Sequence, residues 1–258
     1  MGTSEERITV GEGAAAREIA VIRRAGAEPG LFWLGGFRSD MAGTKALALD
    51  DFGRERGLAV TRFDYSGHGL SGGSFEEGTI SRWLEEALAV FETTRGPQVV
   101  IGSSMGGWIA LLLTRAHRER VGRAASRAKA MVLIAPAPDF TEDLMWAGFS
   151  EEIRRGILAT GRHEEPSEYS EEPYVVTRAL IEDGRRNLVL GGEIDLGCPV
   201  TILQGVKDTS VPWRHAVRLT THLTRDDVTL TLIPDGDHRL SRPQDIARLE
   251  TVIAGHLA

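Results

Sequence analysis

The chain has 258 residues, 41% of them hydrophobic and 26% charged, which excludes a disordered protein and allows a large buried core. Its formal net charge is −7, so the basic surface that a phosphate backbone requires is missing and no nucleic-acid partner is expected. Cys198 is the single cysteine, which excludes an intrachain disulfide and a cysteine-based metal cluster.

The amino-terminal residues predict no export signal, and the apolar runs of the chain predict no membrane span. Glu5 and Glu6 stand where a secretory signal would have a basic start and an apolar run. The longest apolar run, Trp108–Leu113, is far shorter than a membrane span. A single cysteine fits a reducing compartment. We therefore expect a cytoplasmic protein without a membrane span, and the oligomeric state stays open.

Short apolar runs alternate with helical patterns along the chain, which predicts a mostly parallel sheet with helices on both faces. Several of these runs are rich in Val, Ile and Leu throughout, as expected for strands buried on both faces. The expected strands are Ile19–Arg23, Leu31–Leu34, Ala59–Phe63, Gln98–Gly102, Ala130–Ala135, Val200–Gln204 and Val228–Ile233.

Four helices between these strands have recognisable ends or faces. Thr44–Arg56 is followed by Gly57, a residue suited to a left-handed C-cap. Thr79 precedes a helix whose predicted apolar face consists of Ile80, Leu84, Leu88 and Phe91. Gly107–Arg115 is apolar nearly all round, which predicts a buried helix. Ser241–Gln244 has the pattern of a capping box that opens the last helix.

The alternation stops between residues 138 and 196, where helical patterns occur without a convincing core strand. Insertions of this kind fall beside the ligand-binding edge of open α/β sheets, so we expect a helical cap over a pocket, within one domain covering residues 1–258. The alternative is a helical decoration that does not contact substrate. The expected helices are Glu142–Phe149, Glu151–Thr160 and Pro173–Leu188.

The pattern Gly-x-Ser-x-Gly occurs twice, around Ser71 and around Ser104. A nucleophile elbow needs a strand leading in and a helix leading out, because its serine sits on a strained turn. Ser104 has both, since Gln98–Ile101 precedes it and Trp108–Leu113 follows it. Ser71 lies in a Gly/Ser-rich stretch with no helix close by. We therefore predict that Ser104 is the nucleophile and Ser71 a loop serine.

Two backbone N–H groups are candidates for an oxyanion hole. The first is that of Met105, at the start of the helix after Ser104, where free N–H groups and the helix dipole favour negative charge. In folds with a nucleophile elbow, the second donor comes from the loop after the third strand. That loop is Gly35–Arg38 here, so we predict that the N–H of Phe37 is the second donor. The alternative for this loop is an ordinary glycine turn.

In α/β-hydrolases the acid and then the histidine follow the nucleophile along the chain. Asp208 follows the strand Val200–Gln204, at the edge where ligand-facing residues gather, although an aspartate there can also serve a turn. His238 directly follows Val228–Ile233, and we predict that it is the base. The other six histidines are expected to be structural or at the surface. Asp235 and Asp237 are rival acids, but being so close to His238 in sequence they fit a turn better.

The predicted chemistry is that of a serine hydrolase. His238 takes the proton of Ser104, the serine attacks an acyl carbonyl, and Asp208 orients the imidazole. Water then resolves the acyl-serine. No metal is needed, and the sequence contains no cofactor-binding motif.

The residues also resemble the acyl-glucuronide esterase and palmitoyl-protein thioesterase branch of the α/β-hydrolases. The resemblance covers the chain from about Leu31 to its carboxyl end. It is carried by Gly35–Ala46, Arg62–Gly69, Ile101–Trp108, Tyr169–Glu172, Lys207–Asp208, Val211–Trp213 and Asp237–Arg239.

The resemblance implies an α/β-hydrolase fold, the triad Ser104, Asp208 and His238, and hydrolysis of acyl esters and thioesters, including S-acyl cysteine and acyl glucuronides. Apolar cap residues such as Leu144, Trp146 and Ile157 would suit a long acyl chain, although such spacing also fits core packing. One alternative is a short-chain carboxylesterase without a thioesterase role. The other is a non-catalytic ligand-binding protein on a hydrolase scaffold.

Overall fold

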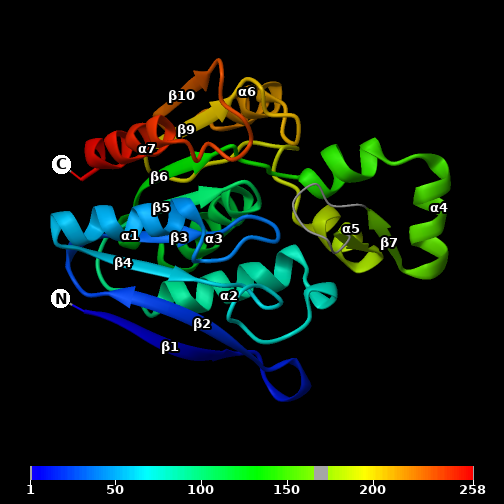
Figure 1. Ribbon diagram of the computed structural model, residues 1–258, viewed down its shortest axis with the longest axis horizontal. Coiled ribbons are helices and arrows are strands. Elements are labelled where there is room, and N and C mark those ends of the chain that lie inside the picture. Colours follow the sequence, from blue (N-terminus) through cyan, green and yellow to red (C-terminus); the bar gives the residue numbers. More distant parts are fainter. Residues whose placement is uncertain (1, 166–173, 258) are drawn as a thin grey trace.

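The computed structural model describes residues 2–165 and 174–257 (Figure 1). Its centre is an eight-stranded sheet, whose strands in spatial order are β1 (Thr3–Val10), β2 (Arg17–Arg24), β4 (Leu58–Phe63), β3 (Ala27–Leu34), β5 (Gln98–Ser103), β6 (Ala128–Ile134), β9 (Val200–Gly205) and β10 (Val228–Ile233). Strand β2 pairs antiparallel with both of its neighbours, β1 and β4, and all other neighbours pair in parallel. The predicted mostly parallel sheet is therefore confirmed.

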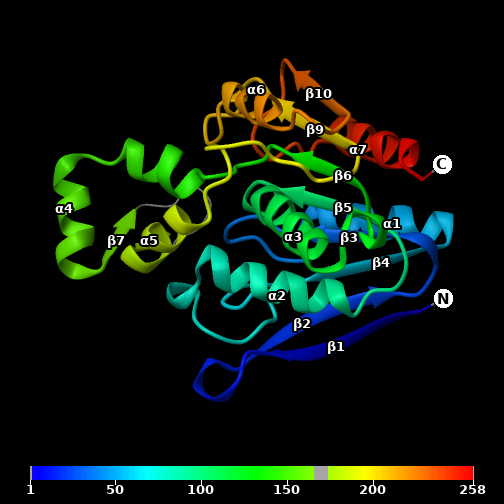
Figure 2. The ribbon, with the colours of Figure 1, turned by 180° about the vertical axis from the view of Figure 1, so that it is seen from behind.

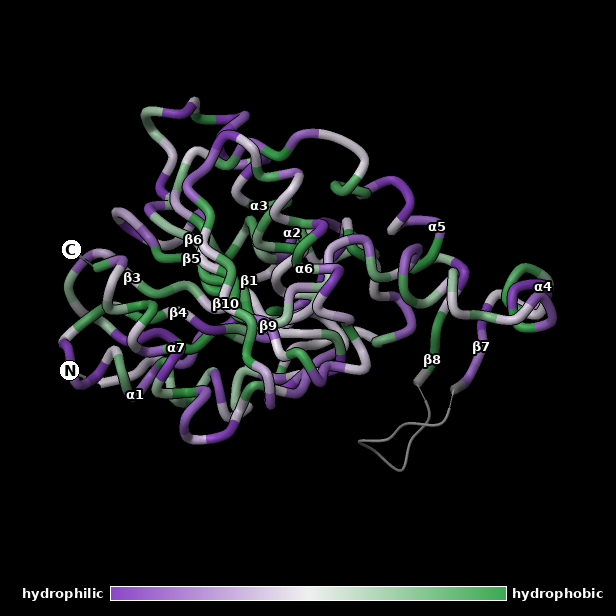
Figure 3. Tube along the Cα trace, turned by 90° about the horizontal axis from the view of Figure 1, so that it is seen from above, coloured by the Kyte–Doolittle hydropathy of each residue, from purple (hydrophilic) through white to green (hydrophobic). Residues whose placement is uncertain are grey.

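Helices cover both faces of this sheet, as predicted (Figure 2). Helices α1 (Thr44–Arg56) and α7 (Pro243–Gly255) pack against one face. Helices α2 (Ile80–Glu92), α3 (Met105–Val121) and α6 (Trp213–His222) pack against the other. Hydrophobic stretches accordingly concentrate on the central strands, whereas hydrophilic stretches lie in the outer loops (Figure 3). No helix in the described part of the chain is long and apolar enough to cross a membrane.

The sequence patterns placed the central elements well and some helix details less well. Helix α1 has the predicted bounds and ends at Gly57, whose φ is +67°. Helix α3 is buried on nearly every side over its first ten residues, as predicted. The buried face of α2 is turned away from the prediction, because Trp83 and Val90 are fully buried while Leu84 and Leu88 are only partly so.

Two predictions at the chain ends were wrong. Strand β1 was missed because its residues are mostly exposed and polar, so it has no apolar run to mark it. The capping box of α7 is shifted by one residue from the predicted Ser241–Gln244. Arg242 is the N-cap residue, and the carboxylate of Asp245 accepts its backbone N–H at 3.2 Å.

The segment between β6 and β9 lies beyond one end of the sheet, away from both chain termini (Figures 1 and 2). It has its own small apolar cluster of Phe149, Ile157, Val176 and Ile181. The predicted helix Pro173–Leu188 was wrong at its start, where residues 174–177 form a strand that pairs with residues 162–165. Tyr169–Glu172 lies outside the described residues. The elements are a π-helical turn Thr141–Trp146, α4 (Glu151–Thr160), β7 (Arg162–Glu165), β8 (Tyr174–Thr177) and α5 (Arg178–Arg186).

Candidate active site

Ser104 sits on the sharp turn between β5 and α3. Its backbone has a φ of +54°, a region that non-glycine residues rarely occupy. The turn is held because the N–H of Ser104 donates to the carbonyl of Ile134 at 2.9 Å, on the neighbouring strand. Such strain persists only where the surroundings fix it, and it is found mainly at functional sites.

The two glycines of the pentapeptide allow strand and helix to approach each other. A Cβ on Gly102 would lie 2.4 Å from the carbonyl oxygen of Gly106, and one on Gly106 would lie 2.1 Å from that of Leu34. Both contacts are with backbone, which cannot move aside. The glycines are therefore required by packing around Ser104, which is the physical basis of the motif.

The structure brings Ser104, His238 and Asp208 together in one line of hydrogen bonds. The imidazole Nε2 of His238 lies 3.1 Å from the Ser104 Oγ, and its Nδ1 lies 2.8 Å from the Oδ2 of Asp208. A carboxylate oxygen only accepts, so Nδ1 carries the proton and Nε2 is free to accept from the serine. The Asp208 side chain is fully buried, while that of His238 is 23% exposed toward the cavity.

Asp208 is itself fixed by three further donors. Its Oδ1 accepts the backbone N–H groups of Ser210 and Val211 at 2.9 and 2.7 Å. Its Oδ2 accepts the side-chain amide of Gln204 at 3.0 Å as well as the histidine. Gln204 was missed by the sequence analysis. The available signal was a polar residue at the end of the otherwise apolar strand β9.

The rival residues have other partners. The Ser71 hydroxyl donates to the carbonyl of Asp64 at 2.6 Å and accepts the N–H of Ala20 at 2.8 Å, so it holds a loop against a strand. Asp235 forms an ion pair with Arg242 at 2.7 Å. Asp237 accepts the N–H of Leu240 at 2.9 Å, which shapes the turn after His238.

The two predicted oxyanion donors both line the cavity at Ser104. Among the described residues, the backbone N–H groups of Phe37 and Met105 donate to no protein acceptor. The loop after β3 passes close to the serine, since a Cβ built on Gly36 would lie 3.4 Å from the Ser104 Cβ. The arrangement offers two donors beside the nucleophile.

A cavity of about 780 Å³ opens at Ser104 and has two kinds of wall. The segment after β6 supplies apolar side chains, among them Phe140, Leu144, Met145, Phe149 and Val176. The loops after β3 and β10 supply polar ones, among them Ser39, Asp40, Lys45, Arg239 and Ser241. Of the three cap residues expected to face substrate, Leu144 lines the cavity. Trp146 and Ile157 pack in or against the small apolar cluster instead.

Lys45 ties α1 to the loop that carries the histidine. Its ammonium donates to the carbonyl of Arg239 and, at 3.3 Å, to the Ser241 hydroxyl. Burial lowers the pKa of Lys45 to about 8, and the neighbouring Arg239 acts in the same direction.

In the described part of the chain no group of three or more His, Cys, Asp or Glu side chains could hold a metal ion.

His68 is buried behind the loop that carries Phe37. Its Nε2 lies 3.1 Å from the backbone N–H of Arg38, and its Nδ1 lies 3.1 Å from the carbonyl of Ser66. Only the neutral ring with the proton on Nδ1 satisfies both partners. Burial lowers the pKa of His68 to about 4. From the sequence, His68 was expected to be a structural or surface histidine.

This histidine makes the protein less stable in acid. An unfolded histidine titrates near pH 6.5, so between pH 6.5 and 4 the unfolded chain binds a proton that the folded chain does not. Its contribution is therefore fully present above pH 6.5 and is lost as the pH falls toward 4. Urea unfolding measured at pH 7 and at pH 4.5 should show that the free energy of unfolding falls by about 2 kcal/mol more in the parent protein than in His68→Gln, because glutamine does not titrate in this range. Equal losses in both proteins would assign the effect to other groups.

Comparisons with known proteins bear on the family and the fold of the chain. Residues 29–249 match the model of the "Alpha/beta hydrolase family". The human protein named "Palmitoyl-protein thioesterase ABHD10, mitochondrial" is 34% identical over 233 residues, which cover 90% of this chain and 74% of that protein. A putative hydrolase from Agrobacterium vitis S4 is 52% identical, with a TM-score of 0.96 over 100% of both chains. Mouse alpha/beta hydrolase domain-containing protein 10 is 30% identical, with a TM-score of 0.86 over 98% of this chain and 97% of that one.

Proposed function

Because the chain belongs to the alpha/beta hydrolase family, we propose that it cleaves carboxylic esters or thioesters through an acyl-serine intermediate. The observation that carries the proposal is the line of hydrogen bonds from Ser104 through His238 to Asp208, in the wall of a cavity of about 780 Å³. The thioesterase relative in human and the hydrolase neighbours support this reaction class.

Each group in this line has a defined role in the proposed mechanism. The Ser104 hydroxyl gives its proton to the Nε2 of His238 as its oxygen attacks the acyl carbonyl. The resulting imidazolium is stabilised by the buried carboxylate of Asp208, and it returns the proton to the leaving alcohol or thiol. Water then attacks the acyl-serine with His238 as base, which releases the acid and restores Ser104.

The carbonyl oxygen becomes negatively charged in both steps. We assign its stabilisation to the backbone N–H groups of Phe37 and Met105, because both line the cavity and have no protein acceptor among the described residues. Preorganised donors of this kind are most effective where charge develops in the transition state.

The two kinds of cavity wall suggest how the substrate lies. We infer that residues 138–196 form a cap within a single domain covering 1–258, and that the acyl group lies against its apolar side chains. The leaving group then faces the polar loops with Lys45 and Arg239. S-acyl cysteine and acyl glucuronides are the substrates that fit both halves, and the human relative bears the name of a palmitoyl-protein thioesterase.

The first test is kcat/KM for matched acetyl and palmitoyl thioesters and an acyl glucuronide, with Ser104→Ala as blank. Preference for palmitoyl supports a long apolar acyl site. Preference for acetyl makes the protein a short-chain carboxylesterase-type enzyme. If none of the three substrates is hydrolysed at a rate that Ser104→Ala abolishes, only a binding role is left. A cytoplasmic location stays a prediction, and the name of the human relative places that protein in mitochondria.

A paired substitution in the cap tests the acyl site directly. Gly148 lines the cavity, and a Cβ there meets no atom within 4 Å, so Gly148→Phe adds a ring at a position where the backbone leaves room for a side chain. If the ring displaces two methylenes of a long chain, the palmitoyl-to-acetyl ratio of kcat/KM should fall by about tenfold. Gly156→Phe is the matched control, because its Cβ is equally free and Gly156 does not line the cavity. An unchanged ratio in Gly148→Phe would place the acyl chain elsewhere.

A further inference from the structure

The loop between β3 and α1 carries backbone strain beside the proposed oxyanion donor. Arg38, the residue after Phe37, has a φ of +55°, which is unfavourable for a side chain of this size. A turn in which the N–H of Ser39 donates to the carbonyl of Gly36 at 3.1 Å brackets the same two residues. A loop of this kind keeps its shape only if neighbouring groups hold it.

His68 supplies one such contact at the strained residue. Its Nε2 accepts the N–H of Arg38 at 3.1 Å, while its Nδ1–H donates to the carbonyl of Ser66 at 3.1 Å. The ring thus links the loop after β3 to the loop after β4. Because His68 is 5% exposed and stays neutral, its acceptor nitrogen is available at ordinary pH.

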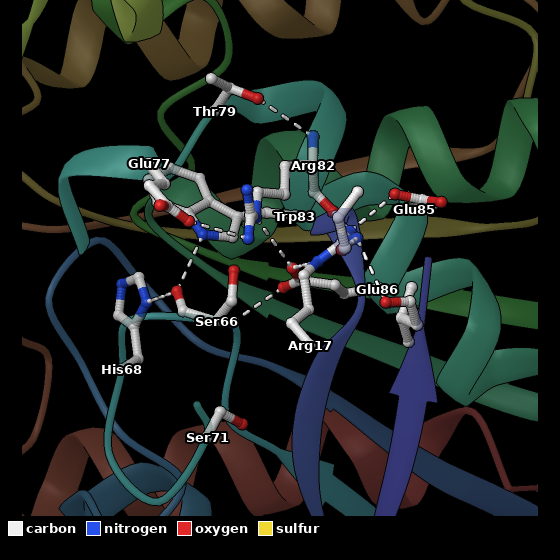
Figure 4. A network of polar contacts seen from close by, with 12 residues as sticks. Arg17, Ser66, His68, Ser71, Glu77, Thr79, Arg82, Trp83, Glu85 and Glu86 are labelled. Carbon is white, nitrogen blue, oxygen red and sulfur yellow. Dashed lines mark hydrogen bonds and ion pairs between the residues drawn. The ribbon is translucent and has the colours of Figure 1, made fainter. Parts of the chain in front are cut away.

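The far end of this link is anchored in the core (Figure 4). The Ser66 carbonyl also accepts the indole N–H of Trp83 at 3.3 Å, and the Ser66 N–H donates to the carboxylate of Glu86 at 2.8 Å. Glu86 is fully buried and pairs with Arg17 at 2.5 Å. Figure 4 shows these side chains joined from His68 to strand β2. The anchor therefore rests on groups that cannot move without exposing a buried charge.

The same aromatic side chains surround both His68 and Phe37. The His68 ring lies 5.2 Å from that of Phe75 and 5.4 Å from that of Trp83, centre to centre. The Phe37 ring lies 4.9 and 6.0 Å from the same two rings. Displacing the histidine would thus disturb the packing of Phe37 as well as the hydrogen bond of Arg38.

We propose that His68 is a positioning residue for the oxyanion hole, holding the N–H of Phe37 toward Ser104 through its hydrogen bond to Arg38. The inference rests on the proposed function, because it assigns no contact between His68 and substrate. A misplaced donor weakens stabilisation of the transition state and leaves ground-state binding largely unchanged.

Two amide substitutions separate positioning from packing. In His68→Gln the side-chain oxygen reaches the place of Nε2 and still accepts from Arg38, but the donor to Ser66 is lost. In His68→Asn the amide nitrogen takes the place of Nδ1 and still donates to Ser66, but the Arg38 N–H loses its acceptor. Each variant keeps one of the two hydrogen bonds, so a purely structural role predicts similar effects.

Positioning predicts a marked difference between them. His68→Asn should lower kcat by about 10²-fold with KM changed less than about threefold, and should weaken binding of a trifluoromethyl ketone, whose adduct places an oxyanion in the hole, by a similar factor. His68→Gln should stay within about tenfold of the parent in both measurements. Equal losses in the two variants, or a change in melting temperature alone, would overturn the proposal.

A measurement on the unaltered protein covers the case in which His68→Asn does not fold. The ¹⁵N resonance of the His68 Nε2 should shift when the trifluoromethyl ketone is bound to Ser104. The Phe37 N–H then donates to the oxyanion of the adduct, and the adjacent Arg38 N–H, which donates to this Nε2, belongs to the same loop. An unshifted resonance contradicts the inference. If the ketone does not react with Ser104 at all, the proposed serine mechanism fails instead, and the two failures are thereby distinguished.

Discussion

Replacing Ser104 with alanine should lower kcat for ester or thioester substrates by about 10⁴-fold or more, while the protein stays folded. The hydroxyl of Ser104 is hydrogen-bonded to His238, so its loss removes the nucleophile and disturbs little else. The strained backbone is held by the bond from the Ser104 N–H to the Ile134 carbonyl, which alanine keeps. Steady-state kinetics and a thermal melt on the same preparation check both halves of the expectation.

Ser71→Ala is the matched control, since Ser71 lies in the second Gly-x-Ser-x-Gly copy. It removes two hydrogen bonds that hold the loop, so it should reduce the free energy of unfolding by about 1–3 kcal/mol and leave kcat nearly unchanged. The opposite pattern, with activity retained in Ser104→Ala and lost in Ser71→Ala, would show that the elbow is assigned to the wrong serine.

Asp208→Asn should lower kcat by about 10⁴-fold through the tautomer of the histidine. The Oδ1 position accepts two backbone N–H groups, from Ser210 and Val211, so the amide oxygen of asparagine must occupy it. The amide nitrogen then faces the Nδ1 of His238 and becomes a donor to it. The ring is driven to carry its proton on Nε2, where it cannot accept from Ser104.

Asp237→Asn provides the comparison for this change. Asp237 is adjacent to His238, but its Oδ1 accepts the N–H of Leu240, which an asparagine oxygen does equally well. Its kcat should stay within about twofold of the parent. Comparable losses in Asp208→Asn and Asp237→Asn, measured as kcat/KM, would mean that charge near the histidine matters more than the direct hydrogen bond.

The central fold could be predicted because its strands are buried on both faces. Strands β5 and β6 are buried almost throughout and consist mainly of apolar residues, which leaves a clear signal in the sequence. Strand β1 has no such requirement, because it is an exposed edge and forms only through pairing with β2. The same holds for β7 and β8, which form only by pairing with each other.

The proximity of the three triad candidates could be predicted because each follows a strand of one parallel sheet, and parallel strands end at the same edge. Gln204 and His68 could not be assigned in the same way. Their partners, Asp208 for one and Arg38 for the other, are set by how loops from different strands meet. That information lies in tertiary packing rather than in any local pattern of residues.

The separate apolar cluster of Phe149, Ile157, Val176 and Ile181 has a consequence for how this protein can change over evolutionary time. Two of its members, Phe149 and Val176, line the cavity at Ser104, while none of the four belongs to the larger apolar clusters that pack on the sheet. Substrate range and chemical machinery can therefore drift independently.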